Sequence, residues 1–507
     1  MQAYLPLFLA PETTVEQRVL MENDLIRFGL KVASKEYLAM NANAEDSKPW
    51  LEQFDAWGQR VDRLHTGEGW KYLKREAAVE QLIHLPYKCM DASKPDYNPN
   101  ARLHQVVKLM LFQPSSGMVS CPLAMTDGAA FTLRELKKEG AFWSSELEKA
   151  YEGLTSKDPG KHWTSGQWMT EKRGGSDVSR ATDTFALEDE GRKCRLYGYK
   201  WFSSATDSEM SLALARIPKS EEELLNGTGG LAMVFLRIKS DSGKLNNIEI
   251  VRLKDKLGTR QLPTAELVLR GTTGLRVSEV GQGVKQIANM LTVTRIHNSL
   301  GALGYMRRIL ALAYDFKERR VAFGKALKDH HLHMAVLGRL EKTYRGNLLF
   351  LLECSSLLQL LDKGDQSQKQ ILRLFTPVLK LFTAKEAVAV CSEGLETFGG
   401  VGYMENSRIP VILRDAQVLP IWEGTTNILS LDFAQEVFKN FKTNFPLLKG
   451  LLTLSPNWQE ETRLDSIPTI AKVNSLQVLS ERFLSSLNAL AKVPDLIQSQ
   501  ARTLAFK

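Results

Sequence analysis

One carboxylate of this chain stands where it could serve as a general base. The residues around it are Trp422-Glu423-Gly424-Thr425-Thr426-Asn427. Apolar spacing over residues 427–441 predicts a helix with its N-cap among the three polar residues, so Glu423 is expected in the loop just before that helix. An apolar wall can raise the pKa of a carboxylate into the range that suits proton removal. An acid that only complements the dipole of the helix is the open alternative.

Two polar stretches further upstream could hold a flat, phosphorylated ligand. The first is Met169-Thr170-Glu171-Lys172-Arg173-Gly174-Gly175-Ser176-Asp177, whose backbone N–H groups and hydroxyls suit a phosphate or the polar edge of a flavin ring. The second, Gly198-Tyr199-Lys200-Trp201-Phe202-Ser203-Ser204, reads as a strand whose aromatic side chains could wall a flat ring. A surface turn and core packing are the respective alternatives. The motifs GxGxxG and GxxxxGKS/T do not occur, so a nicotinamide site of the usual kind is not indicated.

The scaffold that positions these stretches changes type twice along the chain. Helical periodicity marks residues 1–160, which read as mostly helical from residue 50, and it returns over residues 281–441. Residues 161–280 are short β-branched or aromatic segments divided by glycine, typical of antiparallel strands. We predict an α+β chain with domains at 1–160, 161–280 and 281–441, and a helical C-terminal extension at 442–507. The expected helices include Val15 to Tyr37, Gly69 to Leu85, Ala101 to Gln113, Thr132 to Glu139, Val284 to Ala322, His331 to Leu361 and Gln366 to Phe398; the expected strands are Cys194 to Phe202, Ser211 to Ile217, Leu231 to Ile238, Ile248 to Leu253 and Ala265 to Leu269.

Composition narrows the classes of function. A formal net charge of +8 permits an anionic partner, such as a nucleotide cofactor, acyl-CoA, nucleic acid or lipid surface, but no basic block singles one out. Five cysteines without a CxxC pair favour a reducing compartment over disulfides or zinc. No apolar run is long enough for a membrane span, and the N-terminal residues do not resemble a signal peptide. A cytoplasmic location is expected, with mitochondria and peroxisomes as alternatives.

Two further clusters are expected to be structural. The run His330-His331-x-His333 has no acidic or cysteine companion at ligand spacing, so we predict a solvated or packed helix start and no metal site. The Lys254-Asp255-Lys256 segment is expected to be a solvated hairpin turn.

Taken in order, several motifs resemble the acyl-CoA dehydrogenase family. They span about residues 120–440 and are Met169-Thr170-Glu171 with Ser176-Asp177, Gly198-x-Lys200, Arg320-x-x-Phe323-Gly324, Phe398-Gly399-Gly400-Val401-Gly402-Tyr403 and Trp422 to Asn427. Others resemble the AidB branch of that family: Thr170 to Asp177, Lys200-Trp201-Phe202, Arg252 to Gly258, Ile421 to Gly424 and Phe54-Asp55-x-x-Gly58-x-Arg60-Val61-Asp62. One such motif would be weak, whereas the ordered set is specific.

The resemblance implies a fold and a set of site residues. The fold would be an N-terminal helical domain, a middle antiparallel β-barrel and a C-terminal four-helix bundle, assembled as a homotetramer with FAD in each subunit. Glu423 would be the catalytic base, and Trp422, Gly424 and Arg295 would border the substrate, although a purely structural role for Arg295 stays open. The implied FAD-binding residues are Met169, Thr170, Gly175, Ser176, Phe202, Ser203, Ser204, Arg320, Phe323, Gly399, Gly400, Thr425 and Asn427, of which Arg320 and Phe323 would reach the FAD of a neighbouring subunit.

The implied activity belongs to fatty-acid metabolism. Glu423 would remove the α proton of an acyl-CoA thioester while flavin N5 accepts hydride from the β carbon, and the electrons would pass to an acceptor such as a flavoprotein. Two alternatives stay open: a protein that holds FAD and sequesters acyl-CoA with little turnover, and a nucleic-acid-binding protein like AidB. Three departures from the family pattern are Phe202 at the usual tryptophan position, His331 for a glutamine, and Gln435 for the arginine linked to DNA binding in the AidB branch.

Overall fold

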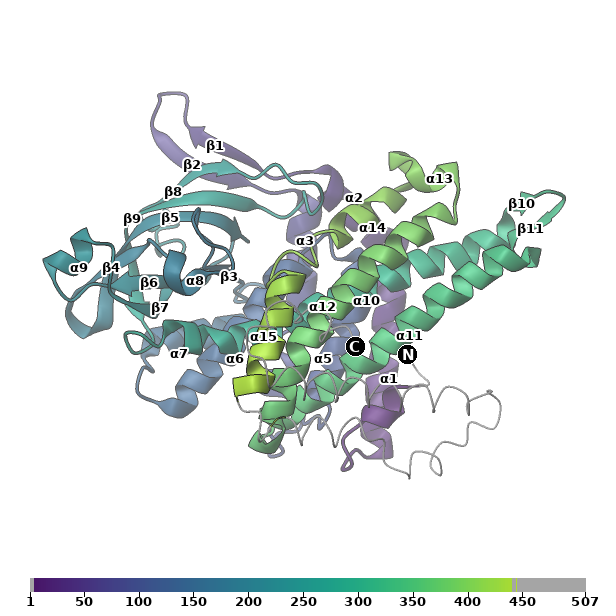
Figure 1. The fold of residues 1–507 in the computed structure, drawn as a ribbon, viewed down its shortest axis with the longest axis horizontal. Helices are drawn as coiled ribbons and strands as arrows, with labels where there is room; N and C mark the ends of the chain where they lie inside the picture. Colours follow the sequence, from purple (N-terminus) through teal and green to yellow (C-terminus); the bar gives the residue numbers. More distant parts are fainter. Residues whose placement is uncertain (1–3, 440–443, 445–507) are drawn as a thin grey trace.

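The computed structural model describes residues 4–439 and residue 444. Helices open the chain, a β-barrel follows, and long helices complete the described part (Figure 1). The barrel lies at one end of the molecule, and a small hairpin of β10 (Val321–Ala322) and β11 (Lys325–Ala326) lies at the other. The expected order of a helical, a β-barrel and a helical domain is confirmed. The extension predicted at 442–507 lies outside the described residues, Asn444 apart.

The N-terminal helices begin at residues that cap them. Thr14 starts α1 (Val15–Val32) through a reciprocal capping box with Gln17. The single helix expected from Val15 to Tyr37 is two helices, because the Ser34 side chain accepts the Tyr37 N–H at 3.2 Å and starts α2 (Lys35–Asp46). The other elements of this part are η1 (Leu5–Phe8), α3 (Glu68–Val79), α4 (Leu85–Lys88), α5 (Ala101–Phe112), η2 (Gln113–Ser115), α6 (Ser120–Glu139) and α7 (Ser145–Leu154).

A hairpin interrupts the stretch that we expected to be mostly helical from residue 50. β1 (Trp50–Phe54) and β2 (Arg60–His65) pair antiparallel, so that expectation is wrong at its start. Asp55 closes the turn by accepting the Trp57 and Gln59 N–H groups, each at 2.9 Å. The hairpin lies along β8 (Ile248–Leu253) of the barrel, where the Ile250 N–H donates to the Asp62 carboxylate at 3.0 Å. It therefore links the N-terminal domain to the middle domain.

The β segment closes into a barrel because its strands pair around a complete ring. β6 (Met210–Ile217) pairs with β4 (Phe185–Glu188) and with β7 (Gly230–Arg237), β7 pairs with β9 (Thr264–Arg276), and β9 pairs with β5 (Lys193–Ser204), which returns to β4. β8 adds to β9, and β3 (Ser165–Trp168) adds to β6. The expected antiparallel barrel is confirmed, with parallel pairing only at β3–β6 and β4–β6 among the described strands. Short helices α8 (Val178–Ala181), η3 (Glu190–Arg192) and α9 (Glu221–Leu225) connect these strands.

Four helices form the C-terminal bundle. α10 (Gly283–Arg319), α11 (His331–Asp362) and α12 (Lys369–Glu396) pack on one another, and α15 (Thr426–Lys439) packs on α12. These are the helices that the apolar spacing predicts. Shorter elements join them: η4 (Leu327–Asp329), η5 (Gln366–Gln368), α13 (Gly400–Tyr403), η6 (Glu405–Ser407) and α14 (Ile409–Ala416). Of the described helices, none has both the length and the apolar character that crossing a bilayer needs.

A buried carboxylate in the helical N-terminal domain predicts a loss of stability in acid. Glu80, with a side chain 4% exposed, pairs with Arg27 and Lys31. Burial alone would raise the pKa of Glu80, but these hydrogen bonds lower it to about 2. Such a group stabilises the folded state above its unfolded pKa of about 4.3, and the contribution disappears as the pH falls from there to about 2. We expect Glu80→Gln to lower the free energy of unfolding in urea by about 3 kcal/mol at pH 7, with a shrinking difference in acid. Glu139→Gln, at an exposed position, is the control, and an equal loss for both variants would contradict the assignment.

Candidate active site

The loop that carries Glu423 has an uncommon backbone. Glu423 has φ +58° and Gly424 has φ +102°, so two consecutive residues are left-handed. This conformation is unfavourable for a residue with a Cβ, and such strain is typical of functional sites. The Thr425 carbonyl then accepts the Leu429 N–H at 3.0 Å, at the start of α15. Glu423 therefore lies in the loop directly before this helix, as expected.

The Glu423 carboxylate is held by a residue that the sequence did not single out. Thr294, on α10, donates its hydroxyl to Glu423 Oε2 at 2.7 Å. Thr294 is buried, whereas Glu423 is half-buried. Trp422 packs against the hydrophobic core and leaves its buried indole N–H without a partner among the described residues. The carboxylate is thus fixed in place beside an apolar wall.

A fully buried lysine lies beneath the same loop. Lys380, on α12, is 0% exposed, and its Nζ donates to the Gly424 carbonyl at 2.7 Å. Burial lowers the pKa of Lys380 to about 7, while Glu423 raises it and Arg295 lowers it further. In the sequence, Lys380 lies within an apolar helical stretch that does not mark it as a site residue. Only its contact with the Gly424 carbonyl places it at the Glu423 loop.

A series of contacts connects the Glu423 loop with the barrel. Burial raises the pKa of the Cys121 thiol on α6 to about 12; Lys256 lowers this pKa and Glu423 raises it, so both charges lie near the thiol. Lys256 Nζ donates to Thr264 Oγ1 at 3.1 Å, and Thr264 Oγ1 lies 3.1 Å from Ser204 Oγ. The base loop, α6 and the end of β5 therefore meet at one place in the fold.

The lysines of the 254–256 segment are not solvated as expected. Lys256 Nζ also donates to the Thr259 and Leu262 carbonyls, at 2.6 and 2.8 Å, and burial lowers the pKa of Lys256 to about 8. Lys254 pairs with Glu266 at 2.6 Å, and its Nζ lies 3.2 Å from the centroid of the Trp201 ring. The expectation of a solvated turn is wrong because the barrel supplies acceptors that cannot be seen locally. Both lysines line a cavity of about 80 Å³ beside Thr264.

A buried ion pair fixes the first predicted FAD-binding stretch to the second. Glu171 is 3% exposed and accepts from Lys200 Nζ at 2.6 Å, and from the Asp183 and Thr184 N–H groups. The Trp201 N–H donates to the Thr170 carbonyl at 3.0 Å. The two stretches thus form one unit. The ion pair that joins them connects residues 29 positions apart in the sequence.

The predicted FAD-binding residues of these stretches lie at the edge of the barrel. Phe202 is 49% exposed, whereas Ser203 is fully buried, and its hydroxyl has no hydrogen-bond partner among the described residues. The others in this group are Met169, Thr170 and Ser204, which are half-buried, and Gly175 and Ser176, which are exposed. Their role in holding FAD stays a prediction.

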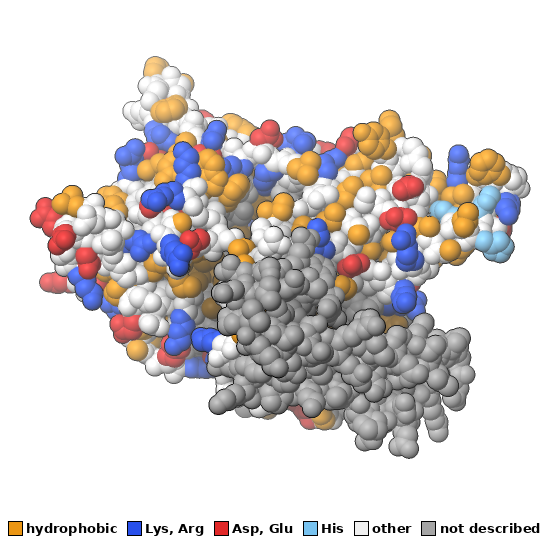
Figure 2. Space-filling view, viewed as in Figure 1, with side chains coloured by type: hydrophobic (Ala, Val, Ile, Leu, Met, Phe, Trp, Pro, Cys, Tyr) orange, Lys and Arg blue, Asp and Glu red, His pale blue; other side chains and the backbone are white. Residues whose placement is uncertain are grey.

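Four of the predicted FAD-binding residues do not converge on this place within one chain. Phe323 lies in the turn of the β10–β11 hairpin at the far end of the molecule and is 98% exposed, and Arg320 caps α10 directly before that hairpin. Gly399 and Gly400 are exposed, and no atom of the part of the chain that the structure describes lies within 4 Å of the position that an added Cβ would take. The hairpin end shows hydrophobic and histidine side chains at its surface (Figure 2).

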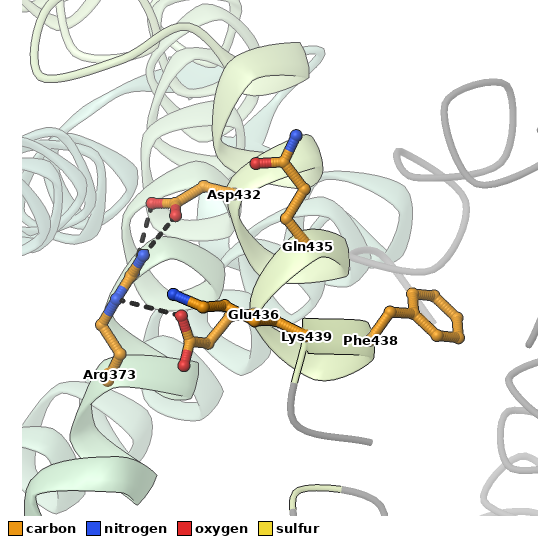
Figure 3. Close-up of a pocket in the computed structure, with 6 residues that line it drawn as sticks. All are labelled: Arg373, Asp432, Gln435, Glu436, Phe438 and Lys439. Atoms are coloured by element: carbon orange, nitrogen blue, oxygen red, sulfur yellow. Dashed lines mark hydrogen bonds and ion pairs between the residues drawn. The ribbon is translucent and has the colours of Figure 1, made fainter. Parts of the chain in front are cut away.

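Two predicted residues, Arg295 and Gln435, are neighbours of a small acidic cluster formed by Asp432 and Glu436. Arg295 pairs with Asp432 at 2.8 Å, and Arg373 pairs with both Asp432 and Glu436. Figure 3 shows the two acids turned toward Arg373, whereas Gln435 points away from it, at the edge of a cavity of about 440 Å³. Asp432 is thus the structural partner of Arg295, whereas contact between Arg295 and a substrate stays a prediction.

The histidines give two different results. His331 begins α11 and is exposed, and His330 Nε2 lies 3.1 Å from the Ala322 carbonyl, as expected for a solvated or packed helix start.

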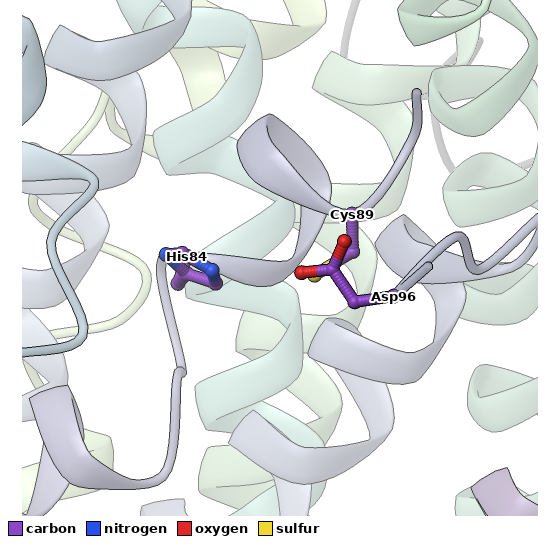
Figure 4. Close-up of side chains that lie close together, drawn as sticks. All are labelled: His84, Cys89 and Asp96. Atoms are coloured by element: carbon purple, nitrogen blue, oxygen red, sulfur yellow. The ribbon is translucent and has the colours of Figure 1, made fainter. Parts of the chain in front are cut away.

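Elsewhere, in a group that the sequence spacing did not reveal, one ligand-type atom each of His84, Cys89 and Asp96 lies within 4.8 Å of the others (Figure 4). These side chains have partners in the chain: His84 Nδ1 lies 2.8 Å from the Thr155 carbonyl, and the Cys89 thiol donates to Asp96 at 3.8 Å. Burial and the neighbouring Asp96 raise the pKa of Cys89 to about 11, so the thiol keeps its proton at neutral pH.

The hydrogen bond between Thr294 and Glu423 makes a prediction of its own. Thr294→Val keeps the shape of the side chain but removes the donor that fixes the carboxylate. For the acyl-CoA dehydrogenation that the sequence resemblance implies, we expect the rate of flavin reduction to fall by about tenfold, the usual effect of a lost hydrogen bond to a charged group. Thr292→Val, two residues away on α10, is the matched control, since the Thr292 hydroxyl donates to the Ala288 carbonyl of its own helix at 3.1 Å. Equal rates in both variants, followed by stopped-flow absorbance, would show that this hydrogen bond has no role.

Protein-family models match three successive parts of the chain. The N-terminal domain of adaptive response protein AidB matches residues 8–153. The middle and C-terminal domains of acyl-CoA dehydrogenase match residues 166–272 and 281–438. The matches follow the helical, β-barrel and helical order of the structure.

Individual proteins show the same relationship. Acyl-CoA dehydrogenase family member 11 of Caenorhabditis elegans is 46% identical over 488 residues, which cover 95% of this chain and 77% of that protein. The AidB protein of Escherichia coli (strain K12) is 30% identical over 412 residues, or 80% of this chain and 72% of that protein. The crystal structure of C. elegans ACDH-11 in complex with C11-CoA gives a TM-score of 0.86 at 43% identity, with 97% of this chain and 82% of that chain covered. Motifs, fold and relatives therefore agree that this chain belongs to the acyl-CoA dehydrogenase family, a family of oxidoreductases, and is related to its AidB branch.

Proposed function

We propose that this protein is an FAD-dependent acyl-CoA dehydrogenase in which Glu423 removes the α proton of an acyl-CoA thioester, with a 2-enoyl-CoA as product. One observation carries the proposal. The Glu423 carboxylate is held at 2.7 Å by Thr294, on a left-handed loop directly before α15. A carboxylate fixed in this way, half-buried and beside an apolar wall, is suited to act as a general base.

The residues at the edge of the barrel fit FAD. Phe202 presents an exposed flat ring, with the hydroxyls of Thr170 and Ser204 on the two stretches that meet there. At Gly175 the nearest atom to an added Cβ would be Thr170 Cγ2 at 3.6 Å, which leaves the backbone open on its other side. When bound, FAD accepts the hydride that leaves the β carbon of the substrate. The proposed binding set is Met169, Thr170, Gly175, Ser176, Phe202, Ser203, Ser204, Thr425 and Asn427, with Gly399 and Gly400 close to the adenosine diphosphate part and with Arg320 and Phe323 reaching the FAD of a neighbouring subunit.

Glu423 and its neighbours supply the proton chemistry. The proton bound to the α carbon moves to a carboxylate oxygen of Glu423, which Thr294 keeps in one orientation. Because a thioester α proton is only weakly acidic, the base has to be fixed and partly shielded from water. Trp422 provides that shielding, and we propose that it borders the acyl chain together with Gly424 and Arg295.

The assembly and the partners form part of the same proposal. Arg320 and Phe323 lie far from the barrel of their own chain, which supports contact with FAD of a neighbouring subunit in a homotetramer. The bound C11-CoA of the C. elegans structure supports an acyl-CoA ligand here. We further propose that a flavoprotein accepts the electrons in fatty-acid metabolism, and that residues 1–160, 161–280 and 281–441 are separate domains.

One second function has specific support. A protein that binds FAD and sequesters acyl-CoA would show the same loop and the same likeness to an acyl-CoA complex, but it would not turn over. Nucleic-acid binding has no comparable support in the described residues, because Gln435 stands beside Asp432 and Glu436 rather than in a basic surface.

Anaerobic titration separates these functions. The purified yellow protein is mixed with acyl-CoAs of increasing chain length while the visible band of the oxidised flavin is recorded. Loss of the band is the result that we expect, and the chain length that gives the fastest loss would define the substrate class. A shift of the band without loss would favour sequestration, and a protein that carries no flavin would refute both.

A further inference from the structure

Lys380 is a charged residue in a place where charges are costly. It and Lys200 are the lysines among the largest fully buried side chains of the described residues. Lys200 has the carboxylate of Glu171 at 2.6 Å, but within residues 4–439 no carboxylate lies at ion-pair distance from Lys380. Its hydrogen bond goes instead to a neutral carbonyl, that of Gly424. A methionine would fill this space at a lower cost in solvation, so packing does not explain the lysine.

The carbonyl that Lys380 holds belongs to the strained turn of the base loop. Glu423 and Gly424 have φ values of +58° and +102°, and an added Cβ at Gly424 would meet the Leu429 side chain at 3.0 Å. A turn that is unfavourable for glutamate persists only where its surroundings fix it. The contact joins residues 44 apart, from the middle of α12 to the loop before α15. It fixes the peptide group next to the base.

The charges around Lys380 come from two other elements. Glu423, on the loop, favours the protonated amine, whereas Arg295, on α10, opposes it. The charge of Arg295 is already compensated by Asp432 at 2.8 Å. Glu423 is therefore the neighbouring charge that favours the ammonium form of Lys380.

We propose that Lys380 is a positioning residue for the dehydrogenation: it holds the Gly424 carbonyl, fixes the left-handed turn and thereby keeps the Glu423 carboxylate in place at the substrate α carbon. This inference rests on the proposed function, since it assigns a task in the same reaction. Lys380 itself touches neither the reacting carbon nor the proton.

The test compares Lys380→Met with wild type and with Lys385→Met, an exposed position on the same helix. The flavin-loaded proteins are mixed anaerobically with the acyl-CoA that reduces the wild type fastest, and the single-turnover rate and the Kd are measured from about pH 6 to pH 9. We expect Lys380→Met to slow flavin reduction by about 10–100-fold, as misplacement of a catalytic group does, with Kd changed by less than about threefold. Lys385→Met is expected to behave as wild type.

A second readout does not depend on activity. Because the pKa of Lys380 is lowered to about 7, the unfolded state binds more protons than the folded state between that pH and the ordinary lysine pKa of about 10.4. Thermal unfolding of the wild type and of Lys385→Met should therefore shift upward as the pH rises through this window, relative to Lys380→Met. If Lys380→Met does not fold, Lys380→Gln carries the same expectations for rate and Kd.

The outcomes distinguish this inference from the proposal beneath it. Folded Lys380 variants that reduce flavin at the wild-type rate, while the wild type is active, would overturn the inference alone. A slowed rate explained wholly by weaker acyl-CoA binding would overturn it as well. A wild-type protein that no acyl-CoA reduces would overturn the proposed function and this inference together.

Discussion

Glu423→Gln is expected to slow reduction of the bound flavin by acyl-CoA by about 10²–10⁴-fold, the usual contribution of a general base. Glutamine keeps the size of the side chain, and its amide oxygen can still accept a hydrogen bond from the Thr294 hydroxyl. In the wild type, this hydroxyl lies 2.7 Å from Glu423 Oε2. The amide cannot take up the α proton at neutral pH. Acyl-CoA should still bind, so a shift of the flavin band is expected to remain where its rapid loss disappears.

The control for this change is another glutamate of the same chain. Glu222→Gln alters an exposed residue of α9, far along the chain from the loop. It should leave the single-turnover rate as it is. Rapid loss of the flavin band in Glu423→Gln, at the wild-type rate, would remove Glu423 from the reaction and leave the base unassigned.

Glu171→Ala is expected to lower the free energy of unfolding by about 3–5 kcal/mol, the cost of breaking a buried ion pair from one side. The substitution leaves Lys200 without its carboxylate at a position that is 0% exposed, and it removes the acceptor for the Asp183 and Thr184 N–H groups. Because Glu171 fixes Thr170 and its neighbours to β5, we also expect weaker retention of FAD. Urea unfolding and the ratio of flavin to protein measure the two effects.

A double-mutant cycle shows whether the charge is the cause. Lys200→Met removes the amine, and in the double variant with Glu171→Ala both charges of this pair are gone. We expect the double variant to be more stable than Glu171→Ala alone, because an apolar pair avoids the cost of an isolated buried charge. Additive losses from the two single changes would mean that the pair is not coupled.

Much of the fold could be predicted from local sequence signals. The helix after Glu423 begins at Thr426, among the three residues whose side chains suit an N-cap, and strand β8 has the bounds that its alternation predicts. The hairpin at Trp50–Phe54 and Arg60–His65 could not be predicted in this way, because its β1 strand pairs within a helical part of the chain and rests on a strand almost 200 residues later. Similarly, Val15 to Tyr37 reads as one helix until the capping contact of Ser34 is seen.

The residues of the candidate site also fall into two groups: those that the local sequence reveals and those that it does not. Glu423 stands out because its neighbours are an aromatic residue, a glycine and a helix start, all adjacent in sequence. Thr294 and Lys380 do not, because their contacts with the loop span 129 and 44 residues and their own surroundings are ordinary helix. The sequence predicts Lys256 in solvent because its hydrogen-bond acceptors are not recognisable locally. The carbonyls and the hydroxyl that accept from its Nζ come within reach only when the 259–264 segment folds back over it. Spacing reveals residues that act with their sequence neighbours, and it misses those that act across elements.

The most direct measurement follows the fate of the α hydrogens. Wild-type protein loaded with flavin is mixed anaerobically with an acyl-CoA that carries deuterium at both α positions, and the product is analysed by mass spectrometry while the flavin band is followed. We predict slower loss of the band than with the undeuterated substrate, and a 2-enoyl-CoA that has lost one α deuterium and one β hydrogen, with neither change in Glu423→Gln. An acyl-CoA recovered with both deuterium atoms, beside a flavin that stays oxidised, would contradict proton removal by Glu423.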